Sequence, residues 1–209
     1  KVSIRPAIIR EISIGGLVFK NHPCIIIDKK DLEIKLFGLI KVLKIDGIIG
    51  WNAIKQMDLR LDYRNKKVRM ERPVPVDNCE RNFFWLGYPV VKAATVSGRS
   101  LFFGLDTGAN KSSASDSVLS KIDTADMTKK KVRTGGAGGK IETRMMKKIP
   151  KMPVVIGGNL LTFEDVHCDN AEHGSFFVLD GILGSDAAKN GVMHLDFTNG
   201  RFDLLFPEK

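Results

Sequence analysis

The sequence predicts an all-β protein built from duplicated lobes, with few and short helices. Short β-type runs dominate the 209 residues, and glycine pairs or proline-containing stretches separate them. Two distant segments repeat each other, and 43% of the residues are hydrophobic, which is sufficient for a buried core. No apolar run approaches the roughly 20 residues that a membrane helix requires, so we expect no membrane span.

The internal repeat aligns residues 46–70 with residues 180–204 without gaps, at an offset of 134 residues. The identical pairs are Asp46/Asp180, Gly47/Gly181, Ile48/Ile182, Gly50/Gly184, Ala53/Ala187, Lys55/Lys189, Leu61/Leu195, Asp62/Asp196 and Asn65/Asn199. Upstream, an Ile-Gly-Gly at Ile14 corresponds to another at Ile156. A period of this length indicates duplicated lobes rather than a solenoid, whose units are much shorter.

The repeat also predicts the domain organisation. We expect residues 1–72 to form the C-terminal half of a first lobe, residues 73–83 a linker, and residues 84–209 a complete second lobe. Prolines and polar residues interrupt the strand pattern in the linker. Short helices are expected at Trp51–Met57 and Asp186–Gly191. By the spacing of the second lobe, the equivalent beginning of the first lobe is expected upstream of Lys1.

The second lobe begins with two predicted strands between Tyr88 and Phe103, joined at a Ser97-Gly98 turn. Leu101–Leu105 then leads directly into Asp106-Thr107-Gly108, where glycine permits a close backbone approach. Residues 115–122 predict a short helix with Ser115 or Asp116 as its cap. A glycine-rich tip follows between two strand-like arms, and its flexibility would allow it to close over an extended peptide.

This order of elements resembles the retropepsin-like and pepsin-like aspartic peptidases over about residues 84–206. The motifs that support the resemblance are Asp-Thr-Gly-Ala at Asp106, the glycine-rich hairpin, and Ile182-Leu183-Gly184 before a last helix and strand. The resemblance implies closed β-barrel lobes, with Asp106 as the catalytic acid. It implies that the acid is supported by Thr107, Gly108, Ala109 and Asn110, and that the flap over the substrate comprises Gly135, Gly136, Ala137, Gly138 and Gly139. It also favours an exported protein.

A carboxylate at this turn is useful beside a second one, because two acids that share a proton titrate apart and divide the acid and base roles. The expected activity is therefore that of an aspartic endopeptidase acting on a peptide or protein substrate, without cofactor or metal. The sequence contains one Asp-Thr-Gly. The second acid is expected from an upstream first-lobe segment, which the repeat favours, or from a homodimer partner. The alternative is a non-catalytic peptide-binding or structural module on the same fold.

Other functions are less well supported by the residues. The net charge is +9, but no aromatic residues lie among the lysines of residues 129–131 and 147–151, so we expect no nucleic-acid partner. Residues 135–140 lack the spacing of a phosphate-binding loop. His167, Cys168, Asp169 and His173 lack the paired spacing of a metal site. The three cysteines, Cys24, Cys79 and Cys168, allow at most one disulfide.

Overall fold

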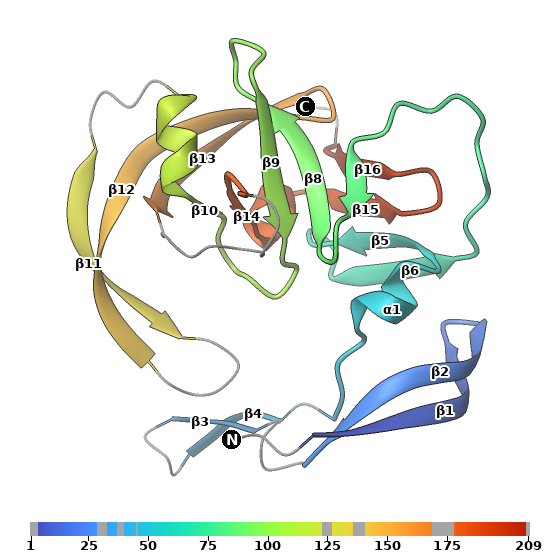
Figure 1. The fold of residues 1–209 in the computed structure, drawn as a ribbon. Coiled ribbons are helices and arrows are strands. Elements are labelled where there is room, and N and C mark those ends of the chain that lie inside the picture. Colours follow the sequence, from blue (N-terminus) through green and yellow to red (C-terminus); the bar gives the residue numbers. More distant parts are fainter. Residues whose placement is uncertain are drawn as a thin grey trace.

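A computed structural model describes residues 4–28, 33–36, 40–44, 46–122, 127–135, 141–168 and 178–207 (Figure 1). These residues form mainly β-strands, which confirms the predicted all-β class. Their helical elements are a single turn of α-helix, α1 (Trp51–Ile54), and two 3₁₀-helices, η2 (Asp116–Ser120) and η3 (Ser185–Ala188). Among the described residues, no helix has the length and apolar character needed to cross a membrane.

The N-terminal part, residues 4–71, begins with a long hairpin of β1 (Ile4–Ile14) and β2 (Leu17–Ile27). The strands pair in antiparallel register from Ile4 with Ile27 to Ile14 with Leu17. Gly15 and Gly16 form the turn at φ values of +55° and +86°, which glycine adopts without steric cost. A smaller hairpin of β3 (Glu33–Leu36) and β4 (Ile40–Lys44) follows.

The C-terminal part, residues 83–207, contains an eight-stranded sheet with the order β11-β12-β13-β10-β14-β9-β8-β7. Its strands are β7 (Phe83–Trp85), β8 (Pro89–Ala94), β9 (Ser100–Leu105), β10 (Ser113–Ala114), β11 (Thr128–Gly135), β12 (Ile141–Ile156), β13 (Asn159–Cys168) and β14 (Gly181–Leu183). The sheet curls until β12 meets β8 at the single pair of Val155 with Ala94. The expected closed barrel is therefore not formed by the described strands, because one residue pair does not continue the ladder.

A four-stranded sheet joins the two parts, with the order β16-β15-β5-β6 (Figure 1). It consists of β5 (Asp58–Asp62) and β6 (Lys67–Glu71) from the N-terminal part and β15 (Val192–Asp196) and β16 (Arg201–Leu205) from the C-terminal part. The central pair is antiparallel and centred on Arg60 with His194. These two residues are also equivalent in the sequence repeat, so β5 and β15 are related by an approximate twofold axis.

One hydrophobic cluster contains buried residues from both parts. Met57 and Leu59 contribute from the N-terminal part, and Met193, Leu195 and Phe202 contribute from the C-terminal part, each no more than 5% exposed. The joining sheet is thus packed as interior rather than as a surface contact. The three cysteines, which allowed one disulfide, are all free thiols.

The helices are shorter than the sequence predicted. The segments expected at Trp51–Met57 and Asp186–Gly191 are reduced to α1 and η3, which begin after Gly50 and Gly184 at equivalent repeat positions. The helix expected over residues 115–122 is the 3₁₀-helix η2, and Ser115 does not cap it through its side chain. The Ser115 hydroxyl instead donates to the Leu179 carbonyl at 2.6 Å.

Candidate active site

Asp106 lies directly after the last residue of β9. The side chains of Leu101, Phe103 and Leu105 are fully buried, whereas Asp106 is exposed. The Asp106 amide donates to the Leu183 carbonyl at 3.0 Å, which extends the parallel pairing of β9 with β14 by one residue. A well-packed strand therefore ends in an exposed carboxylate whose backbone is held in the sheet.

The turn that follows holds the carboxylate itself. The Gly108 amide donates to Oδ1 of Asp106 at 2.9 Å, and the Ala109 amide donates to the Asp106 carbonyl at 3.1 Å. The Ser185 amide and hydroxyl both donate to the Ala109 carbonyl, at 2.8 and 3.0 Å. Thr107 is half-buried and Asn110 is exposed. The structure thus brings these five predicted residues together in one turn that is anchored to η3.

A second contact between the turn and η3 was not predicted from the sequence. The Ser112 hydroxyl donates to Oδ1 of Asp186 at 2.6 Å, and the Ser112 amide contacts both carboxylate oxygens at 2.9 Å. The Gly184 amide in turn donates to the Ser112 hydroxyl at 3.0 Å. Asp186 occupies the first turn of a helix, where a carboxylate is usually an end cap, so its sequence position gave no sign of this contact.

Glycine is required where η3 approaches the turn. A Cβ atom added to Gly184 would lie 2.8 Å from the Lys111 carbonyl carbon and 2.9 Å from the Ala109 oxygen. A Cβ added to Gly181 would lie 2.0 Å from the Ser113 oxygen. Both neighbours are backbone atoms that cannot move aside. The Gly-Ile-Leu-Gly motif is thus explained by the close approach of β14 and η3 to residues 109–113.

The neighbouring Asp180 is buried, with 1% of its surface exposed, and it has a structural role. Its Oδ2 accepts the Phe102 amide at 2.9 Å, and its carboxylate accepts the Lys121 ammonium and the Ser117 hydroxyl at 2.8 and 3.0 Å. The charge is therefore paired and its hydrogen-bonding capacity is used, as a buried carboxylate requires. These contacts hold the backbone of β9 at Phe102, four residues before Asp106.

The predicted flap lies on the hairpin of β11 and β12, which extends from the sheet as a long ribbon (Figure 1). Gly135 ends β11 and pairs with Ile141. Gly136, Ala137, Gly138 and Gly139 lie outside the described residues. The described arms end at Gly135 and Ile141, on either side of the predicted glycine-rich tip.

Positive charge lies near the turn on the side of β13. The pKa of His167 is lowered by its burial and by the cations of Lys148 and Lys111. Lys148 forms an ion pair with Asp165. Within the described residues, no group of three potential metal ligands comes together. Asp169 and His173, two members of the metal set considered from the sequence, lie outside those residues.

The sequence was compared with known families, curated proteins and solved structures. Residues 92–187 match a family described as aspartyl protease, and the matched segment runs from β8 to η3 and includes Asp106. The resemblance to aspartic peptidases that the motifs indicated is confirmed over this segment. No curated protein and no solved structure gave a match.

Proposed function

Because residues 92–187 match a family described as aspartyl protease, we propose that the protein is an aspartic endopeptidase with Asp106 as one of its two catalytic carboxylates. One carboxylate removes a proton from a water molecule, which attacks the peptide carbonyl. The other, protonated, donates a hydrogen bond to the carbonyl oxygen. The reaction needs no covalent intermediate on the protein.

The observation that carries this proposal is the environment of Asp106. Its carboxylate is exposed at the end of a buried strand, and one of its oxygens already accepts the Gly108 amide at 2.9 Å. The turn is tied to η3 through Ala109 and Ser112. A catalytic group must be held in place by its neighbours before the substrate binds, and these contacts supply that support.

The proposal requires a second carboxylate, and the repeat suggests where it docks. In the C-terminal part, β14 holds the strand that bears Asp106. The equivalent residues of the N-terminal part include Ile48 and Ile49, which are 70% and 48% exposed and belong to no described strand. We propose that a strand ending in the second acid docks along residues 47–49, as β9 docks along β14.

Two sources of that strand were expected from the sequence, a segment upstream of residue 1 or a second copy of the chain. The edge of β15 that a symmetric dimer would share is already occupied by β5 of the same chain, in twofold register. The β9 strand of a second copy is likewise held between its own β8 and β14. These two observations favour the upstream segment.

The substrate is proposed to be a peptide or protein bound in extended form between the Asp106 turn and the β11–β12 hairpin. The glycine-rich residues 135–139 would contact its backbone as a flap. Strand-like binding presents alternate side chains to the protein, so pockets beside the acid would set the cleavage preference. The net charge of +9 and the cations near His167 favour substrates with acidic residues.

The first prediction is that Asp106→Asn abolishes cleavage of denatured casein at mildly acidic pH and leaves the fold intact. The expected loss is at least a thousandfold, because the amide removes a proton acceptor on which the reaction depends. Asp116→Asn is the matched control, since Asp116 lies on η2 and pairs with Lys147. Cleavage by the Asp106 variant at the wild-type rate would exclude this assignment.

Mixing the Asp106 variant with wild-type protein distinguishes the two sources of the second acid. If the upstream segment supplies it, residues 1–209 alone are inactive, and in the chain extended by that segment activity falls in proportion to the wild-type fraction. If a second copy supplies it, mixed dimers lose activity and the fall is steeper, with a specific activity that rises with protein concentration. Peptide binding without cleavage by any form of the protein would support the non-catalytic module instead.

A further inference from the structure

Tyr88 lies directly before β8, the strand that pairs with the one leading to Asp106. The strands β8 and β9 pair in antiparallel register with Val90 opposite Gly104. Extending this register by two residues places Tyr88 opposite Asp106, with both side chains on the face that Gly104 also shares. Gly87, at a φ of +79°, and the hydrogen bond from the Leu86 amide to the Tyr88 carbonyl set the turn that begins β8.

The Tyr88 ring covers the surface of Gly104, two residues before the acid. A Cβ atom added to Gly104 would lie 2.7 Å from Cε1 of Tyr88, and 3.0 Å from the Cδ1 atoms of Ile182 and Leu179. Three apolar groups thus meet over a position that has no side chain of its own. The Tyr88 side chain is half-buried, so part of the ring remains exposed on the face that carries Asp106.

The pKa of Tyr88 agrees with a position beside Asp106. The pKa of Tyr88 is raised by burial and, in addition, by the negative charge of Asp106. The phenol is therefore protonated and neutral at any pH at which two carboxylates share a proton. A neutral ring beside the acid contributes shape and apolar surface to the site rather than charge.

We infer that Tyr88 is a specificity-determining residue, whose ring forms the wall of the substrate side-chain pocket next to Asp106. This inference rests on the proposed peptidase function and concerns which peptide bonds are cut. A substrate that passes Asp106 in extended form directs a side chain toward the sheet face on which Tyr88 and Ile182 lie. The ring limits the size of that side chain, because apolar pockets discriminate by the volume they leave.

The test is the size of the residues beside the bonds that are cut in denatured casein, identified by mass spectrometry for the cleaving form of the protein. Tyr88→Ala should increase cleavage beside large residues relative to small ones by roughly tenfold, the discrimination that a few methylene groups give in an apolar pocket. Tyr88→Trp should shift the preference toward small residues. Phe102→Ala, on the same face of β9 but farther from the acid, should leave the profile unchanged.

The two substitutions of Tyr88 keep the inference testable if one of them does not fold, which circular dichroism would reveal. A merely structural role would lower the amount of active protein without changing which bonds are cut. Wild-type profiles from the folded Tyr88 variants would overturn the inference and leave the proposed function intact. If neither residues 1–209 nor the chain extended by its upstream segment cuts casein, the proposed function itself fails, and the inference that rests on it fails too.

Discussion

Residues 46–71 and residues 180–205 have the same local structure in the two parts of the molecule. Both contain one short helical turn after a glycine, followed by a strand, a tight turn and a second strand. In both tight turns an asparagine three residues after an aspartate donates its backbone and side-chain amides to that carboxylate. The pairs are Asn65 with Asp62 and Asn199 with Asp196. Local sequence therefore determines these turns.

The two segments differ in burial and in the strands that lie beside them. Leu183 is fully buried on β14, which lies between β9 and β10 in the sheet, whereas its equivalent, Ile49, is 48% exposed and belongs to no described strand. A Cβ on Gly184 would meet backbone atoms, but a Cβ on Gly50 would meet nothing within 4 Å. The local fold of the segment therefore does not need neighbouring strands, whereas its burial depends on them.

The largest difference in the free energy of unfolding is expected between alanine variants of these two equivalent apolar residues. Leu183→Ala should lower the free energy of unfolding by about 2–5 kcal/mol, because it removes a side chain from a packed core and leaves a cavity. Ile49→Ala should cost less than about 1 kcal/mol, as exposed positions usually do. Urea unfolding followed by circular dichroism measures both values. Equal losses would mean that residues 47–49 are covered in solution.

A smaller difference in the free energy of unfolding is expected between alanine variants of Asn199 and Asn65. The Asn199 side chain accepts the Val76 amide at 2.7 Å and donates to the Val74 carbonyl at 2.9 Å, so it ties residues 74–76 to the joining sheet. Asn65 is exposed, and its side chain contacts Asp62 alone among the described residues. Asn199→Ala should therefore destabilise by about 1–3 kcal/mol, because two backbone groups of residues 74–76 lose the hydrogen-bond partner that the buried Asn199 side chain supplies.

The control is Asn65→Ala, for which a loss of roughly 0.5 kcal/mol is expected. The two variants remove the same chemical group from equivalent turns, so the difference between them isolates the contacts with residues 74–76. Thermal or urea unfolding gives both values. A loss as large for Asn65 as for Asn199 would show that the turn itself, rather than its partners, carries the stabilisation.

Much of this fold could be predicted from sequence because its signals are local. The apolar run Leu101–Leu105 indicated the strand before Asp106, and Ser97-Gly98 indicated the turn between β8 and β9, where Gly98 has a φ of +84°. The repeat indicated two segments that have the same local structure in both parts. The limits of the lobes and the origin of the second acid stay predictions, since they depend on strands that these signals do not describe.

The supporting contacts of the candidate site could not be predicted because they join residues far apart in the chain. Ser112 and Asp186 are separated by 74 residues, and nothing in either local sequence indicates the other. Tyr88 has a similar relation to Gly104, which depends on the register of two strands. The closed barrel was expected from the resemblance alone, and the single pair of Val155 with Ala94 does not close it.

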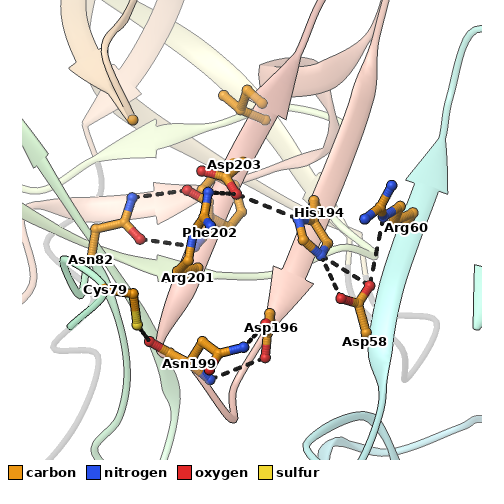
Figure 2. A network of polar contacts seen from close by, with 12 residues as sticks. Asp58, Arg60, Cys79, Asn82, His194, Asp196, Asn199, Arg201, Phe202 and Asp203 are labelled. Carbon is orange, nitrogen blue, oxygen red and sulfur yellow. Dashed lines mark hydrogen bonds and ion pairs between the residues drawn. The ribbon is translucent and has the colours of Figure 1, made fainter. Parts of the chain in front are cut away.

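The smallest expected effect concerns the centre of the approximate twofold axis, where His194 faces Arg60 (Figure 2). The Nε2 atom of His194 lies 2.9 Å from both carboxylate oxygens of Asp58, and its Nδ1 atom lies 3.4 Å from Oδ2 of Asp203. Arg60 and Arg201 lie beside these two carboxylates at 3.6 and 3.0 Å. When it is protonated, the His194 imidazole thus bridges acids from both parts of the molecule.

The pKa of His194 is raised, first by its hydrogen bond to Asp203 and also by Asp58, although burial opposes the shift. The bridge therefore stabilises the fold fully below the unfolded pKa of about 6.5 and loses this contribution as pH rises through the higher folded pKa. The pKa of Asp203 is lowered, chiefly by His194, so its contribution is present above about pH 3.8 and is lost as pH falls through the lower folded value. The two pKa shifts together therefore stabilise the fold most at mildly acidic pH.

His194→Gln should therefore lower the free energy of unfolding by about 1 kcal/mol at pH 5.5 and by less above neutrality, since the wild-type bridge is then deprotonated. Urea unfolding from pH 5 to 9 measures the difference between the two proteins. His167→Gln is the matched control, and its effect should have the opposite slope. The pKa of His167 is lowered by burial and nearby cations, so wild-type protein loses stability there as pH falls. Parallel curves for wild type and His194→Gln would mean that the junction of the two parts does not depend on the charge of this imidazole.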